Sequence, residues 1–228
     1  MGSIKVDRID SIEFENVSFT YPNEDKPVLR DINFKASTGE QLVIVGLNGS
    51  GKSTIIKLLM GFYPTDSGRI LINGIDLREI DMDSYLSVVS CVFQDVVPYA
   101  LTVEKNITAS QFNSDKDKLK QAIFSASLDT VFDSKTLKSE MTREFYNDGV
   151  VLSGGTMQKT ALARALYKNA SLMILDETTS AIDPESEIQI INSIERAVSK
   201  CIIVQISHKL SCVKSGSKIL YIENGYII

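Results

Sequence analysis

Short apolar runs alternate along this chain with stretches whose apolar residues recur every three or four positions. The first pattern predicts buried strands and the second predicts amphipathic helices. The expected strands cover 12–21, 28–36, 41–45, 69–74, 88–93, 172–175 and 201–206, and 218–228 forms a hairpin around Asn224-Gly225. The expected helices cover 55–59 (ended by Gly61), 117–128, 153–166 and 185–198. Strands that alternate with helices in this way favour an α/β fold with a mostly parallel core sheet.

Two segments modify this simple alternation. Polar and apolar residues alternate over 12–21, which predicts an edge-type strand with a bulge near Asn16. Helical patterns dominate 102–168, so this block is expected to be a helical insert. We therefore expect one domain over 4–228, with a core of 4–101 and 169–228. Residues 1–3 are typical of an added expression sequence.

Composition and charge narrow the classes of function. With 228 residues the chain can bury a substantial core, and its net charge of −5 provides no basic surface for nucleic acid as the main partner. Cys91, Cys201 and Cys212 are far apart and lack metal-type spacing, which predicts reduced, structural thiols in a reducing compartment. The uncharged stretch 84–94 is too short to span a bilayer, so the isolated chain is expected to be soluble.

A glycine-rich loop follows the apolar strand 41–45. Its sequence matches G-x-x-x-x-G-K-[ST], and apolar residues at helical spacing follow it. Glycines let backbone N–H groups approach phosphate oxygens, the lysine reaches the outer phosphates, and the serine hydroxyl is a Mg²⁺ ligand. The alternative is a strand-to-helix turn that binds nothing. The expected phosphate-binding residues are Gly46, Asn48, Gly49, Ser50, Gly51, Lys52, Ser53 and Thr54.

Two acids follow the apolar strand 172–175. A phosphate loop needs a carboxylate that holds Mg²⁺, and Asp176 fits this role. Glu177 comes next and is placed to polarise a water molecule against the γ-phosphate. The alternative is a buried strand that simply ends in a solvated acidic turn.

A second glycine motif, Leu152-Ser153-Gly154-Gly155-Thr156, begins the helix over 153–166. A serine cap at a helix N-terminus is itself an anion site, although taken alone it is an ordinary helix start. Together with the phosphate loop and Asp176, this motif resembles the signature of ATP-binding-cassette (ABC) ATPases. The resemblance implies a P-loop NTPase core with a mostly parallel sheet, an antiparallel β-subdomain and a helical insert subdomain. It also implies ATP and Mg²⁺ as cofactors.

Other positions correspond to family motifs once this resemblance is considered. Tyr21 resembles the aromatic residue that stacks on adenine, and its alternative is a structural tyrosine. Gln94 resembles the glutamine that contacts Mg²⁺ and the attacking water. His208 resembles the switch histidine near the γ-phosphate, and 180–183 resembles the D-loop. The resemblance covers nearly the whole chain, from Ile12 to Ile228.

The stretches 12–22 and 102–107 are similar to those of exporter-type domains. The chain thus resembles the ATP-hydrolysing domain of a bacterial-type exporter separated from its membrane domain, with peptide or lantibiotic export as one candidate. The resemblance implies a place at the cytoplasmic face of the cell membrane, a transmembrane-domain partner and a head-to-tail dimer. In that dimer, Ser153, Gly154 and Gly155 of one copy face the phosphate held by Lys52 of the other.

Two departures from the family pattern leave alternatives open. Thr156 stands where the family usually has glutamine, and 143–149 replaces the usual exporter stretch before the signature. One alternative is a weakly hydrolysing, ATP-gated binding module. The other is a soluble ABC ATPase of DNA repair or translation, against which the lack of a coiled-coil insertion, a second cassette and basic bias argues.

Overall fold

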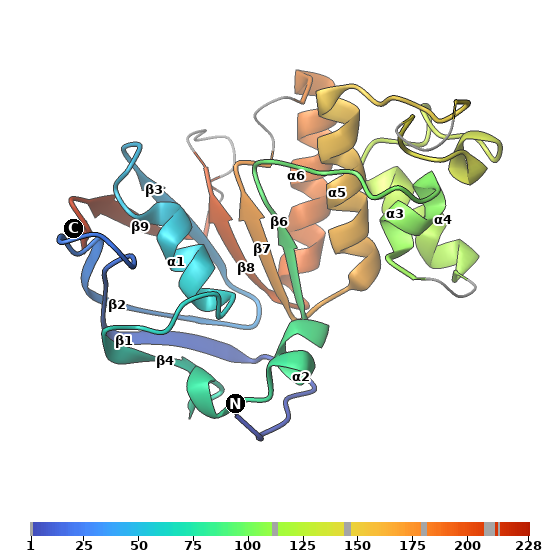
Figure 1. The fold of residues 1–228 in the computed structure, drawn as a ribbon. Helices are drawn as coiled ribbons and strands as arrows, with labels where there is room; N and C mark the ends of the chain where they lie inside the picture. Colours follow the sequence, from blue (N-terminus) through green and yellow to red (C-terminus); the bar gives the residue numbers. More distant parts are fainter. Residues whose placement is uncertain (1, 111–113, 144–146, 179–181, 208–212, 214) are drawn as a thin grey trace. The chain divides into compact units, whose positions relative to one another are not determined.

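The structure is a computed structural model that describes residues 2–110, 114–143, 147–178, 182–207, 213 and 215–228. The chain divides into two compact units (Figure 1). The first unit comprises Met1–Cys91, Ala170–Glu177 and Ala197–Ile228, and the second comprises Val92–Asn169 and Thr178–Arg196. The boundaries predicted from the sequence for the core and the helical insert remain predictions.

Two sheets form the framework of the first unit. The antiparallel sheet has the order β2-β1-β4-β5 and contains β1 (Ser11–Phe19), β2 (Leu29–Ser37), β4 (Ser67–Ile72) and β5 (Ile75–Asp76). The other sheet has the order β10-β9-β3-β8-β7-β6. Its strands are β3 (Gln41–Gly46), β6 (Val89–Val92), β7 (Leu172–Asp176), β8 (Ile202–Ile206), β9 (Lys218–Glu223) and β10 (Tyr226–Ile227). Parallel pairing joins β3 to β8 and β9, and β7 to β8, which confirms the predicted mostly parallel core.

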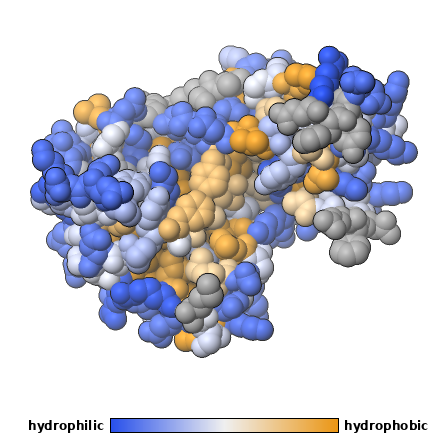
Figure 2. Space-filling view, in the orientation of Figure 1, coloured by the Kyte–Doolittle hydropathy of each residue, from blue (hydrophilic) through white to orange (hydrophobic). Residues whose placement is uncertain are grey.

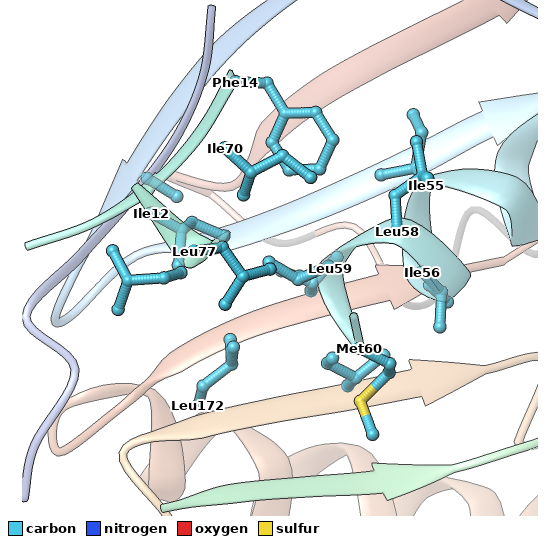
Figure 3. Close-up of a cluster of buried hydrophobic side chains, with 14 of the residues drawn as sticks. Ile12, Phe14, Ile55, Ile56, Leu58, Leu59, Met60, Ile70, Leu77 and Leu172 are labelled. Carbon is cyan, nitrogen blue, oxygen red and sulfur yellow. The ribbon is translucent and has the colours of Figure 1, made fainter. Parts of the chain in front are cut away.

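Helix α1 (Lys52–Leu59) is buried between these two sheets (Figure 3). Its Ile55 and Leu58 are completely buried. Phe14 and Ile70 of the antiparallel sheet face α1 from one side, and Leu172 of β7 lies on the other (Figure 3). Each such side chain stabilises the fold by about 1.5–3 kcal/mol through removal from water. The N-terminus of α1, where the glycine loop ends, is therefore fixed by burial on two sides.

The first strand departs from its predicted position in the sheet. β1 pairs with both β2 and β4, so the prediction of an edge strand is wrong. Alternating polarity reports one buried and one solvated face, and it does not determine how many neighbours a strand has. The bulge is confirmed: the register shifts between Phe14 and Val17, and Asn16 has a φ of 49°.

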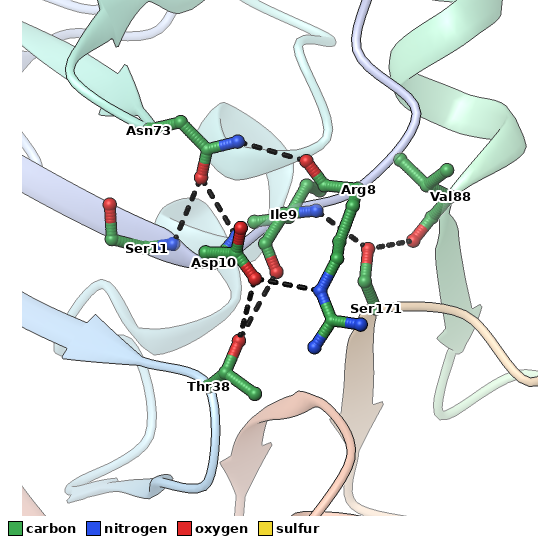
Figure 4. Close-up of polar contacts among 8 residues, drawn as sticks. All are labelled: Arg8, Ile9, Asp10, Ser11, Thr38, Asn73, Val88 and Ser171. Carbon is green, nitrogen blue, oxygen red and sulfur yellow. Dashed lines mark hydrogen bonds and ion pairs between the residues drawn. The ribbon is translucent and has the colours of Figure 1, made fainter.

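Side-chain hydrogen bonds hold the segment 8–11 in place (Figure 4). Asn73, in the turn between β4 and β5, accepts from two amides of this segment at 2.8 and 3.0 Å and donates to a carbonyl at 2.9 Å. The Ser171 hydroxyl accepts from the Ile9 amide at 2.9 Å and donates to the Val88 carbonyl at 3.3 Å. The segment that leads into β1 is thus joined to elements distant in sequence.

Helices dominate the second unit. They are α3 (Val103–Thr108), α4 (Lys116–Ser125), α5 (Gly154–Lys168) and most of α6 (Pro184–Val198). Helix α5 contacts both α3 and α4, and their apolar faces enclose a separate core. Helices α4, α5 and α6 confirm the helices predicted over 117–128, 153–166 and 185–198 to within a few residues at each end. The short helix α2 (Met82–Ser87), in the first unit, was not predicted from the sequence; Asp81 caps it by accepting from the Ser84 amide at 2.9 Å.

The described cysteines are free thiols, as predicted. Burial raises the pKa of Cys91 to about 12 and that of Cys201 to about 11, so both stay protonated at neutral pH. Cys212 lies outside the described residues. Hydrophilic side chains cover much of the face in Figure 2, where apolar residues show in patches. Among the described residues, no helix has the length and apolarity needed to cross a bilayer.

We predict that Ile44→Ala lowers the free energy of unfolding by about 2–5 kcal/mol, because it leaves a cavity in the core strand β3. Ile44 is 0% exposed. The matched control is Ile219→Ala in β9, where the side chain is 53% exposed and the loss should stay below about 1 kcal/mol. Urea unfolding measures both, and equal losses would contradict the described core.

Candidate functional site

The glycine loop after β3 depends on two positions that admit no side chain. Gly46 has a φ of 153°, and a Cβ there would lie 2.2 Å from the carbonyl oxygen of Ile222. Gly51 has a φ of 109°, and a Cβ there would lie 2.6 Å from Leu29. At Gly49, by contrast, a Cβ would meet nothing within 4 Å, so this part of the loop borders open space. The backbone therefore turns tightly at its base and is accessible at its tip.

Lys52 is the first residue of α1, and its side chain folds back onto this loop. Its Nζ donates to the carbonyl oxygens of Gly46 at 2.9 Å and Leu47 at 2.8 Å. Burial lowers the pKa of Lys52, whereas the nearby charges of Glu177 and Asp176 oppose this shift. A buried ammonium at the base of a glycine loop is suited to bind an anion.

Two serine hydroxyls of the loop differ in their surroundings. Ser50 is buried, and its Oγ has no hydrogen-bond partner among the described residues. Such an unsatisfied hydroxyl costs about 1–3 kcal/mol and marks a place that a polar ligand can complete. The Ser53 hydroxyl is close enough to the carboxyl of Asp176 to oppose the rise in its pKa that burial causes. The loop therefore offers one polar group to a ligand and places another near an acid.

Asp176 and Glu177 stand where β7 ends. Asp176 is 7% exposed, and burial raises the pKa of its carboxyl, an effect that the nearby Ser53 hydroxyl opposes. Glu177 has a φ of 50°, an unusual left-handed conformation for a residue other than glycine, and its amide donates to the Ile206 carbonyl at 3.2 Å. Strained backbone of this kind is concentrated at functional sites.

The oxygen donors at this position fit a hard cation. The Ser53 hydroxyl lies near the Asp176 carboxyl, and carboxylate and hydroxyl oxygens are suitable ligands for Mg²⁺. Within the described part of the chain, His, Cys, Asp and Glu side chains form no group of three that could hold a metal.

Tyr21 lies beside the first turns of α1. Its hydroxyl is 3.1 Å from the Thr54 Oγ1, and the Lys57 Nζ lies 5.3 Å from the ring centroid. The ring packs edge-on against Phe19 and Tyr63, with centroid separations of 5.0 and 5.4 Å. The first unit thus brings together Tyr21, the glycine loop and the two acids.

The remaining predicted residues belong to the second unit or fall outside the description. Gln94 is exposed and follows β6. Ser153 caps α5, its Oγ accepts from the Thr156 amide at 3.2 Å, and Gly154 and Gly155 form the first turn. His208 lies outside the described residues, as do 180 and 181 of the predicted D-loop.

Sequence reasoning missed an ion pair that joins α5 to the start of α6. Lys159 donates to the carboxylate of Asp183 at 3.0 Å and to the Ser186 hydroxyl at 2.5 Å. The Ser186 amide and Lys159 hold the pKa of Asp183 well below its usual range. The sequence does contain one signal, since an aspartate before Pro184 is typical of a helix cap. Its pairing with Lys159 could not be predicted from spacing.

A second unpredicted network surrounds Asn106 of α3. This side chain is completely buried, and its amide donates to the carbonyls of Tyr99 and Leu101, both at 3.0 Å. Arg164 of α5 donates to the Asn106 carbonyl at 2.6 Å and lies 4.6 Å from the centre of the Tyr99 ring. Helix α5, which Ser153 caps, is therefore joined to the loop before α3.

Comparison with known proteins identifies the family. The sequence model of the ABC transporter family matches residues 29–180, more than half of the chain. The chain belongs to the ABC transporter family. The predicted family and the predicted fold class are both confirmed. It is an ATP-binding domain of this family, whose members hydrolyse ATP to power transport.

Individual relatives of this ABC domain are much longer than the chain. The subtilin transport ATP-binding protein SpaT of Bacillus subtilis is 40% identical over 98% of the chain and 37% of its own length. The ATP-dependent lipid A-core flippase of Escherichia coli K12 is 37% identical over 95% of the chain and 37% of its own length. A bacterial Atm1-family ABC exporter solved with ATP bound superposes with a TM-score of 0.88 at 31% identity, covering 98% of the chain and 39% of that protein. The chain thus spans little more than a third of these relatives.

We predict that Asp176→Asn raises the melting temperature at pH 7. Because the folded state raises the pKa of this carboxyl, folding takes up protons, and stability falls as pH rises from the usual aspartate range. Asparagine removes this penalty, so the advantage of the variant should shrink towards pH 4.

The matched control is Asp183→Asn. The pKa of Asp183 is lowered, so its charged form stabilises the fold above the usual aspartate range. This variant should melt below the parent at pH 7 and approach it as pH falls. Melting curves between pH 4 and 8 test both signs, and the same sign for both variants would refute the assignment.

Proposed function

We propose that this ABC domain binds and hydrolyses MgATP as the nucleotide-binding domain of an exporter, in which ATP-driven closure of two copies is coupled to transport across the membrane. One observation carries the proposal. Lys52, buried at the base of the glycine loop, lies within electrostatic reach of both Asp176 and Glu177. Nucleotide hydrolysis requires a cation that binds phosphate, an acid that holds the metal and a second acid that activates water. Lys52, Asp176 and Glu177 can supply these three groups.

We propose the following roles at the ATP site. The loop residues Gly46, Asn48, Gly49, Ser50, Gly51 and Thr54 surround the phosphates with backbone and hydroxyl donors, and Lys52 binds the outer phosphates. Ser53, Asp176 and Gln94 hold Mg²⁺, which when bound neutralises charge on the transferring phosphate. Glu177 accepts the proton of the attacking water, and His208 contacts the γ-phosphate. Tyr21 stacks on adenine.

The site as proposed needs a second copy of the chain. Ser153, Gly154 and Gly155 would complete it from the facing copy in a head-to-tail dimer, because α5 presents backbone N–H groups and the positive end of a helix dipole. The remaining partner is a transmembrane domain, which places this domain at the cytoplasmic face of the membrane. The net charge of −5 supports the absence of a nucleic-acid partner.

We further propose that the transported substrate is a peptide, which is the most specific part of this proposal. It rests on the relative named for subtilin transport, which is 40% identical, against 37% for the lipid A-core flippase. A competing function, an ATP-gated binding module with little turnover, is suggested by Thr156 in the signature. The two functions differ in turnover and agree in ATP binding.

The decisive variant is Glu177→Gln. We expect turnover to fall at least about 100-fold, since a general base contributes 10²–10⁴-fold, while ATP affinity changes little. Phosphate release should be measured over a range of protein concentrations because each site needs two copies, and affinity by titration with a fluorescent ATP analogue. Glu79→Gln, at an exposed acid of the same unit, is the control and should match the parent.

Turnover of Glu177→Gln at the parent rate would disprove the role of Glu177 as the base. A parent chain that binds ATP but releases no phosphate, including when joined to its membrane domain, would favour the ATP-gated module.

A further inference from the structure

The Thr156 side chain contacts the Ser153 hydroxyl. Ser153 Oγ accepts from the Thr156 amide at 3.2 Å and lies 2.9 Å from Thr156 Oγ1, so one of the two hydroxyls donates a hydrogen bond to the other. Ser153 is exposed and Thr156 is half-buried. A Cβ added to Gly154 would meet nothing within 4 Å, so the space beside Ser153 is open within its unit.

Counting protons limits what Ser153 can do. A hydroxyl donates one hydrogen bond and accepts two. The Thr156 amide occupies one acceptor position of Ser153 Oγ. If Thr156 Oγ1 donates, the second acceptor position is filled as well, and the Ser153 proton can only be donated away from this pair. If instead Ser153 donates to Thr156, its proton is directed back towards its own helix.

An anion beside Ser153 favours one of the two directions of the hydrogen bond between the Ser153 and Thr156 hydroxyls. A phosphate oxygen accepts hydrogen bonds and lowers the energy of the arrangement in which Ser153 donates outward. The result is a chain from Thr156 to Ser153 to the anion, in which each hydrogen bond polarises the next and the last is charge-assisted. The N-terminal end of α5 favours negative charge at the same place.

We propose that Thr156 is a positioning residue whose hydroxyl donates to Ser153 and thereby directs the Ser153 proton to the terminal phosphate of ATP held by the facing copy. This inference rests on the proposed function, in which Ser153 completes the ATP site. Thr156 thus acts through Ser153, where the family's usual glutamine has a longer side chain with its own amide. The departure in the signature is then a substitute for the usual contact.

The first test compares two variants at position 156. Thr156→Val keeps the shape and removes the hydroxyl, whereas Thr156→Ser keeps the hydroxyl. We expect kcat/KM for ATP to fall about five- to tenfold for Thr156→Val, the value of one net hydrogen bond, and to stay within about twofold of the parent for Thr156→Ser. Unchanged melting temperatures exclude a purely structural effect. Thr156→Val at or above the parent rate would overturn the proposal, because Ser153 would then donate to Thr156.

The second test is a double-mutant cycle with Ser153→Ala. This variant should lose about 100-fold in kcat/KM, as expected for a donor to developing charge. Because Thr156 acts only through Ser153, adding Thr156→Val to Ser153→Ala should change nothing further. An equal loss from Thr156→Val in both backgrounds would refute the inference.

The cycle also separates this inference from the proposed function. If Ser153→Ala costs turnover and Thr156→Val does not, only the positioning role fails. If Ser153→Ala leaves turnover unchanged at every protein concentration, the shared ATP site itself is wrong, and the positioning role fails with it.

Discussion

The burial of α1 between two sheets is the interaction on which the proposed ATP site depends. A helix over Lys52–Leu59 is too short to be stable in water alone, so tertiary packing must hold it. The antiparallel sheet covers one side and the parallel sheet the other. Since the glycine loop runs directly into α1, the positions of its N–H groups and of Lys52 follow from that packing.

Unfavourable local features are concentrated at the ends of β3 and β7. A buried lysine, an unsatisfied serine hydroxyl, a carboxyl with a raised pKa and a left-handed glutamate occur within these few residues. Elsewhere the core of the first unit is mostly apolar, and its buried Gln41 and Gln205 side chains are joined by a hydrogen bond of 2.9 Å. This contrast is typical of functional sites, where local strain is tolerated because the surrounding structure fixes it.

Local patterns were sufficient to predict most elements. The strands β3, β7 and β8 are apolar runs, and the loop after β3 carries a motif with a strict spacing. The strands and the loop can therefore be predicted from local sequence, without knowledge of long-range contacts. The central place of β1 was not visible, because sheet order depends on pairing with Ile32 and Ile70 far along the chain. Helix α2 is too short for its period to stand out.

At the site, residue types were easier to predict than their contacts. The sequence identified Tyr21 and Ser153 as candidates, but their hydrogen bonds with Thr54 and Thr156 depend on rotamers that spacing does not specify. The pair of Lys159 and Asp183 joins positions with no periodic relation.

The two carbonyl oxygens that hold the Lys52 ammonium act as an internal competitor for its ligand. In the proposed ATP site, phosphate oxygens would replace the oxygens of Gly46 and Leu47 as partners of Lys52, so the affinity for a nucleotide would reflect the difference between these two bonded states. A weakly basic anion gains little from this exchange, whereas a polyphosphate gains much. In the proposed cycle, the same carbonyls would receive the ammonium again when the product leaves, so the buried charge would keep a hydrogen-bonding partner throughout. This exchange would make binding reversible, as the proposed repeated hydrolysis requires.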